Sequence, residues 1–131
     1  MKLVTIDMLP NAHIGVLVGE DIVLDLTAFS VVSPTAILVP NSMRELLESG
    51  AAGIETVANS LAQVDSMTTS EKSILMDARI LNPLGDISLL APVPNPKLIL
   101  SVGLNYWKHL EEMAGTPTPE YPAAFIKTRD S

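Results

Sequence analysis

The sequence predicts an α+β fold in which a small antiparallel sheet, with a hairpin and two helices, precedes a second and shorter unit. Three observations lead to this prediction. The first 26 residues contain short β-branched runs separated by turn residues, two helix-like apolar patterns follow between residues 42 and 64, and prolines occupy alternate positions from Pro92 to Pro96. The 10 prolines also argue against a helical bundle, because proline interrupts helices.

Three short strands are expected near the N-terminus. Leu3–Ile6 alternates apolar and polar residues and is followed by the turn sequence at residues 10–12. The runs at His13–Val18 and residues 21–26 are rich in β-branched residues, which favour strands. Gly19-Glu20 joins these two runs, so they are expected to form a hairpin.

Two helices are expected next. Ser42 and Glu45 have the spacing of a capping box, in which each side chain accepts a hydrogen bond from the backbone of the other residue. Gly50 is a suitable end for this helix. The second helix is predicted over residues 54–64, with one buried face. That face consists of Ile54, Val57, Ala58, Leu61 and Val64.

The rest of the chain predicts a division into two units. Residues 65–72 are polar and turn-like, and residues 74–90 fit no single element. We expect a support domain at residues 1–91, an extended Pro-rich linker at 92–96, and the start of a second domain at 97–131. Such a short second unit cannot form its own core. It should pack on the first unit, swap with another protomer, or belong to a longer protein, and we favour the last.

Composition narrows the classes of partner. The net charge of -7 disfavours binding to nucleic acid or to anionic membranes. The sequence contains no cysteine, which excludes disulfides and thiolate chemistry. It also lacks a signal-peptide pattern at its start and an apolar run of the ~20 residues that a membrane span requires. A soluble cytoplasmic protein with an aliphatic core is therefore expected.

The residues that can carry chemistry lie after the linker. An apolar run at residues 98–102 ends at Gly103, where either a positive φ, a close approach or a plain turn would explain the glycine. His109 and Glu112 then lie one helical turn apart. A carboxylate beside an imidazole orients the ring and makes a usable general base, although a plain surface histidine is the simpler alternative.

Four further residues have either a functional or a structural role. Tyr106 and Trp107 either line a pocket or pack beneath the helix. Lys127 lies on the same face of an extended segment as Phe125 and either meets an anionic substrate or occupies a strand edge. His13 has no second ligand nearby and is expected to be structural. Two histidines without cysteine do not make a typical zinc site, so no metal ligand is assigned in this chain.

Read together, these segments resemble the fumarylacetoacetate hydrolase (FAH) superfamily. The match comprises Leu-Leu-Ala-Pro-Val-Pro at residues 89–94, Lys-Leu-Ile-Leu at 97–100, Val-Gly-Leu-Asn-Tyr at 102–106, His109, Glu112, Pro122, Phe125 and Lys127. The resemblance implies a small N-terminal domain followed by the first strands of an incomplete FAH-type β catalytic domain. Members bind Mg²⁺, Mn²⁺ or Ca²⁺ through downstream carboxylates. Only four residues follow Lys127, so none of these ligands is expected here.

The resemblance also implies a reaction. His109 and Glu112 would form a dyad, on a short helix that orders over substrate, and would activate water to cleave a C–C bond in a 2-oxo or diketo acid. Tyr106 and Lys127 are the candidate substrate-binding residues. Relatives that decarboxylate, isomerise or hydrate remain possible, as does a catalytically incomplete module with only a structural or oligomerisation role, or an unrelated α+β domain. Exposed apolar strands in the second unit predict a homo-oligomer.

Overall fold

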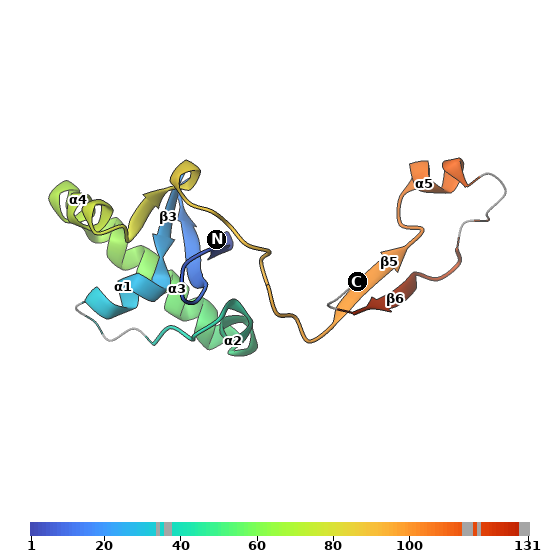
Figure 1. Ribbon diagram of the computed structural model, residues 1–131, viewed down its shortest axis with the longest axis horizontal. Helices are drawn as coiled ribbons and strands as arrows, with labels where there is room; N and C mark the ends of the chain where they lie inside the picture. The colour runs from blue at the N-terminus through green and yellow to red at the C-terminus, as the bar shows by residue number, and fades with distance from the viewer. Residues whose placement is uncertain (34, 36–37, 114–116, 118, 129–131) are drawn as a thin grey trace. The chain divides into compact units, whose positions relative to one another are not determined.

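The computed structural model describes residues 1–33, 35, 38–113, 117 and 119–128 (Figure 1). It divides into two compact units, Met1–Pro94 and Asn95–Ser131. Residues 129–131, at the end of the predicted second domain, lie outside the described residues. Five α-helices and two antiparallel sheets within the described ranges confirm the predicted α+β class.

A four-stranded antiparallel sheet forms the centre of the first unit. Its strands lie in the order β1 (Leu3–Ile6), β2 (His13–Val18), β3 (Ile22–Asp25) and β4 (Leu81–Pro83). The predicted hairpin is confirmed: Val18 pairs with Ile22, and Gly19 adopts a φ of 67° in the turn. The third strand ends one residue earlier than predicted because Leu26 already begins a helix.

The outer edge of β1 is covered by a segment from the far end of the unit. The Asp7 N–H donates to the Ser88 carbonyl and the Leu90 N–H to the Thr5 carbonyl, both at 2.9 Å. The buried hydroxyl of Thr5 donates to the Pro92 carbonyl at 2.7 Å. This hydroxyl is therefore satisfied, and the strand edge is not open to another chain.

Four helices accompany this sheet, and two of them were predicted. They are α1 (Leu26–Val32), α2 (Met43–Glu48), α3 (Ala51–Ser66) and α4 (Thr69–Asp77). Helices α2 and α3 confirm the two predicted helices, but only one of the two hydrogen bonds of the predicted Ser42–Glu45 capping box is formed. The Ser42 side chain accepts from the Glu45 N–H, but the Glu45 carboxylate accepts from the Asn41 N–H instead. Helices α1 and α4 were not predicted. In the segment 65–72, which was expected to be turn-like, α3 ends at Ser66, Met67 and Thr68 interrupt the helical conformation, and α4 begins at Thr69.

The buried face of α3 differs from the predicted one. Val57 and Val64 are fully buried as expected, but Ile54 and Ala58 are exposed. The face is rotated toward Gly53, where an added Cβ would overlap Leu46 of α2. Close packing of α2 therefore decides which side of α3 is covered.

The core is largely aliphatic, as predicted, and lies in the first unit. Every buried residue that the structure describes belongs to Met1–Pro94. The packed cluster consists of Ile14, Val16, Leu24, Leu26, Phe29, Met43, Leu46, Val57, Val64, Leu75, Ile80 and Leu81. Among the described residues, no helix has the length and apolar character needed to cross a bilayer.

The second unit is a two-stranded ribbon with a helix between its strands. Strand β5 (Ile99–Gly103) pairs antiparallel with β6 (Ala123–Lys127), and α5 (Trp107–Glu112) lies between them in the sequence. The register places Leu100 opposite Ile126, and both side chains are exposed, at 60% and 68%. An isolated ribbon of this kind is marginal in water, so these apolar side chains require a further layer.

Candidate functional site

The candidate site is built around the junction of β5 and α5. Gly103 ends the strand, and the positive φ that was one possible explanation for it occurs one residue later, at Leu104, with φ 53°. An added Cβ at Gly103 would find its nearest neighbours at 3.8 Å, which is ordinary contact. Neither a positive φ nor a close approach therefore explains this glycine, and the turn strain falls on Leu104.

His109 and Glu112 face each other on α5, as their spacing predicts. The His109 Nδ1 lies 3.9 Å from the Glu112 Oε2, and the two side chains are 52% and 75% exposed. This distance permits an ion pair when the ring is protonated but is too long for a hydrogen bond. Solvent screens the pair, so it contributes little to stability.

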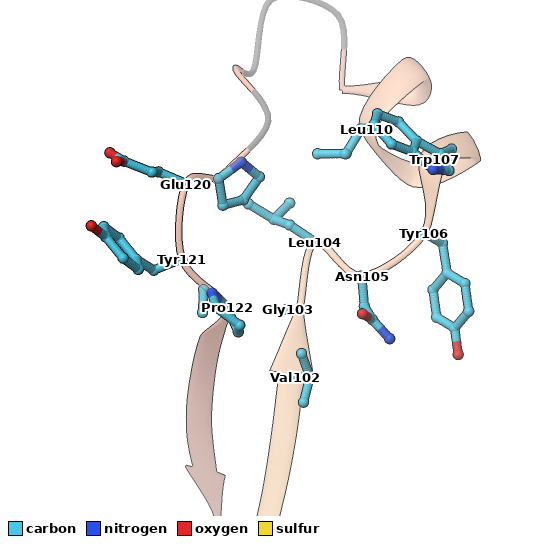
Figure 2. A pocket seen from close by; sticks show the side chains of 12 residues that line it. Val102, Gly103, Leu104, Asn105, Tyr106, Trp107, Leu110, Glu120, Tyr121 and Pro122 are labelled. Atoms are coloured by element: carbon cyan, nitrogen blue, oxygen red, sulfur yellow. The ribbon is translucent and has the colours of Figure 1, made fainter.

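A cavity of about 360 Å³ lies beside the same helix. It opens between the β5–α5 junction and the segment that leads into β6 (Figure 2). Its lining comprises Val102, Gly103, Leu104, Asn105, Tyr106, Trp107, Leu110, Pro119, Glu120, Tyr121, Pro122 and Ala123. Tyr106 thus borders the cavity, whereas His109 and Glu112 are not among its lining residues.

The helical period explains this separation. Trp107 and Leu110 are three residues apart and line the cavity, so they occupy one side of α5. His109 and Glu112 share a different side of the helix. The dyad and the cavity are therefore neighbours on one short helix rather than parts of one enclosed site.

Lys127 is not brought to the helix. It pairs with Ile99, whereas the cavity lies at the Gly103–Ala123 end of the ribbon. Four strand residues separate these ends, or roughly 13 Å at the usual rise of a strand. The Lys127 ammonium instead lies 5.9 Å from the centre of the Phe125 ring, a weak cation–π contact.

Comparison with known proteins identifies the family. No model of a protein family matches the sequence. The chain is 32% identical over 123 residues to "Oxaloacetate tautomerase fahd2, mitochondrial" of Xenopus laevis. The aligned region covers 93% of this chain and 32% of that protein. The chain is also 30% identical over 124 residues to "Oxaloacetate tautomerase FAHD2A, mitochondrial" of Homo sapiens, and that aligned region covers 94% of this chain and 33% of the human protein. The chain belongs to the FAH superfamily.

The Bos taurus relative "Oxaloacetate tautomerase FAHD2A, mitochondrial" gives the same result, with 32% identity over 120 residues. The chain spans about a third of the length of these curated relatives. They are named as mitochondrial proteins, and the cytoplasmic location expected for this FAH-superfamily chain stays a prediction.

The metal chemistry implied by the FAH resemblance can be tested against the residues present. Within the described ranges, no three His, Asp or Glu side chains gather closely enough to hold a metal ion. His109 and Glu112 offer one nitrogen and one carboxylate, fewer than the oxygen ligands that Mg²⁺ requires. The described residues therefore do not fit such an ion.

A second His–carboxylate pair was missed by sequence reasoning. His13 Nδ1 lies 2.6 Å from Asp25 Oδ2, and the Asp25 side chain is 3% exposed. Its other oxygen accepts from the Ala28 N–H at 2.9 Å and caps α1. The pair lies in the support unit of this FAH-superfamily chain, so it is structural. The sequence did contain a signal for this pair: Asp25 ends β3, the strand that pairs with β2, and His13 begins β2.

Proposed function

We propose that this chain provides the proton-transfer helix of an enzyme that acts on 2-oxo acids, with His109 as the proton carrier and Glu112 as its partner. The observation that supports the proposal most is the position of an exposed imidazole and a carboxylate on one side of α5, 3.9 Å apart. The names of the relatives, oxaloacetate tautomerases, agree with proton transfer on a 2-oxo acid.

In a keto–enol tautomerisation, the neutral Nε2 of His109 removes a proton from C3 of the 2-oxo acid. The C3–H electron pair becomes the C2–C3 double bond, and the carbonyl oxygen takes the charge. The imidazolium then returns its proton to that oxygen, which gives the enol and restores the neutral ring. Glu112 stabilises the imidazolium between the two steps and holds Nδ1 toward itself.

The second candidate function is hydrolytic cleavage of a C–C bond, as the FAH motif spacing first indicated. Here His109 removes a proton from water, and the hydroxide attacks a carbonyl carbon. The bond to the neighbouring carbon then breaks, its electron pair leaves as an enolate, and the imidazolium returns its proton to that enolate. We place tautomerisation first because the curated relatives carry that name and because it requires no nucleophilic water.

The function is tested in a chimaera. The chain replaces the aligned third of the human relative, and enolisation of oxaloacetate is followed by ultraviolet absorbance. His109→Gln should lower the rate by about 10²-fold or more, which is the usual contribution of a positioned acid–base group. Lys108→Gln, on the same helix, is the matched control and should retain activity. A fully active His109→Gln chimaera would contradict the proposal.

The 131-residue chain alone is expected to be inactive even with Mg²⁺.

A further inference from the structure

The two faces of the β5–β6 ribbon differ in their chemistry. Side chains alternate between the faces along each strand, and directly opposite residues share a face, so the register assigns every residue. One face, here called the aliphatic face, consists of Leu100, Val102, Ala124 and Ile126. The other face consists of Ile99, Ser101, Gly103, Ala123, Phe125 and Lys127, and so includes a hydroxyl and an ammonium group.

The aliphatic face is also the more exposed of the two. Its three large side chains, Leu100, Val102 and Ile126, are 60%, 51% and 68% exposed. A two-faced antiparallel sheet normally packs its apolar face and solvates the polar one. The alternation therefore indicates that the aliphatic face packs on another layer, while the face with Ser101 and Lys127 stays in solvent.

We infer that the aliphatic face binds the same face of a second copy of this chain, with the strands of the two ribbons running in opposite directions. Sheets that pack face to face lie about 10 Å apart. The two-fold axis crosses the ribbon at the level of the Ser101–Phe125 pair, the middle of the register. Strand β5 then lies over β5 of the other copy, and β6 lies over β6.

The sizes of the side chains favour this orientation. It places Ile126 of one copy over Ala124 of the other, and Leu100 over Val102, so each contact joins a larger side chain to a smaller one. With the strands running in the same direction, Leu100 would lie over Ile126 at one end. Val102 would lie over Ala124 at the other end and leave a gap there, which costs stability.

The charges at the two ends of the ribbon favour the same orientation. Lys97 and Lys127 lie at the end where β5 begins and β6 ends. The opposite end has three carboxylates and one ammonium group, from Glu120 before β6 and from Lys108, Glu111 and Glu112 on α5. Antiparallel ribbons bring the basic end of each copy to the acidic end of the other, whereas parallel ribbons would bring like charges together.

Light scattering of the 131-residue chain tests the interface. The measured mass should be twice the 14.0 kDa of one chain. Ile126→Asp places a charge in the aliphatic face and should return the chain to a monomer, because an unpaired buried charge is costly. Phe125→Asp adds the same charge to the neighbouring residue on the other face and should leave the dimer intact. A monomeric unaltered chain would show that another segment covers the face, and it would overturn the inference, as would equal effects of the two variants.

Cross-linking tests the orientation without placing a charge in the ribbon. The chain has no cysteine, so each engineered thiol is the only one in its copy. Ile126→Cys is mixed and equilibrated with Ala124→Cys, and Leu100→Cys with Val102→Cys, before a short thiol-reactive cross-linker is added. Both mixtures should give more cross-linked dimer than either of their variants alone.

The two mixtures separate the possible arrangements. Ribbons that pair edge to edge join one strand of each copy, so only one mixture could show the increase. Ribbons packed face to face with parallel strands would show it in neither mixture, because β5 would then lie over β6. Either result would overturn the inference.

Discussion

Both carboxylate oxygens of Asp25 are engaged although its side chain is almost fully buried. One oxygen caps α1 through the Ala28 N–H, and the other meets the His13 ring at 2.6 Å. A buried carboxylate is tolerated only when it is paired in this way. The contact links the start of β2 to the start of α1, so a single side chain joins sheet and helix.

Asp25→Ala should lower the free energy of unfolding by about 1–3 kcal/mol, because it removes a helix cap and leaves the partly buried His13 ring without its partner. The measurement is urea unfolding followed by circular dichroism. Asp21→Ala, at an exposed position in the neighbouring turn, is the control and should change the value by less than about 0.5 kcal/mol. Equal effects of the two substitutions would contradict this role for Asp25.

For single residues, the sequence predicts side-chain contacts when the two partners are close together in the chain. The spacing of His109 and Glu112 predicted their contact because one helical turn joins them. His13 was judged to lack a partner because Asp25 is 12 residues away and is brought near by strand pairing. A positive φ was one of three explanations considered for Gly103, and the structure has it one residue later, at Leu104.

At the scale of elements, α4 is closed by local bonds at both ends. At its start, Thr68 and Glu71 form the full capping box that Ser42 and Glu45 were predicted to form. At its end, the Ile80 N–H donates to the Leu75 carbonyl and the Arg79 N–H to the Met76 carbonyl. This is a Schellman motif, with Arg79 in the left-handed conformation at φ 57°.

The capping box makes α4 sensitive to acid. The Thr68 hydroxyl, and then the Thr68 N–H, donate to the Glu71 carboxylate and hold the pKa of Glu71 below its usual value of 4.5. A carboxyl whose pKa is lowered by folding stabilises the fold above its usual value, and that contribution is lost as the pH falls below 4.5 through the folded value. Thr68→Val should raise the Glu71 midpoint in an NMR titration. Identical midpoints in both proteins would refute this.

The end of α4 offers a stabilising substitution. Arg79→Gly should raise the free energy of unfolding by up to about 1 kcal/mol, because glycine adopts the left-handed conformation without the steric cost of a side chain. Ser73→Gly, inside the same helix and also exposed, should lower it, since glycine is a poor helix former. Thermal unfolding of the two variants measures the difference. A loss of stability in Arg79→Gly would count against the motif.

Helices and strands that are marked by an apolar pattern or a turn in their own sequence were predicted, and those without such a mark were missed. Helices α2 and α3 follow clear apolar patterns, and the β2–β3 hairpin follows its turn. Helix α1 was missed because Thr27, Val31 and Val32 are β-branched and continue the preceding strand pattern. The cavity could not be predicted, because it depends on the β5–β6 register that brings residues 119–123 beside residues 102–110.

For the whole molecule, the distribution of the core is the main feature. All described buried residues lie in Met1–Pro94, whereas the ribbon of the second unit exposes apolar side chains from both strands. The chain spans about a third of the length of its curated relatives. Homo-oligomerisation through the exposed strands stays a prediction, as do the 2-oxo acid substrate and the metal that the FAH resemblance implies.

This distribution predicts that residues 1–94 fold without the rest of the chain. Their thermal midpoint by circular dichroism should lie within about 2 °C of that of the whole chain, because the removed residues contribute no buried core. In the whole chain, Leu24→Ala should cost about 2–5 kcal/mol, and Phe125→Ala less than about 0.5 kcal/mol. A shortened chain that fails to unfold cooperatively would show that the second unit supports the first.

The bond between Thr5 and Pro92 has a consequence for protein engineering. It holds the first strand and the last residues of the first unit side by side, so the two ends of that unit are neighbours. Units with adjacent ends tolerate circular permutation and insertion into a host loop. The exposed turn after Val18 is the natural place for new ends, and a permuted version would carry the same sheet with a different starting point.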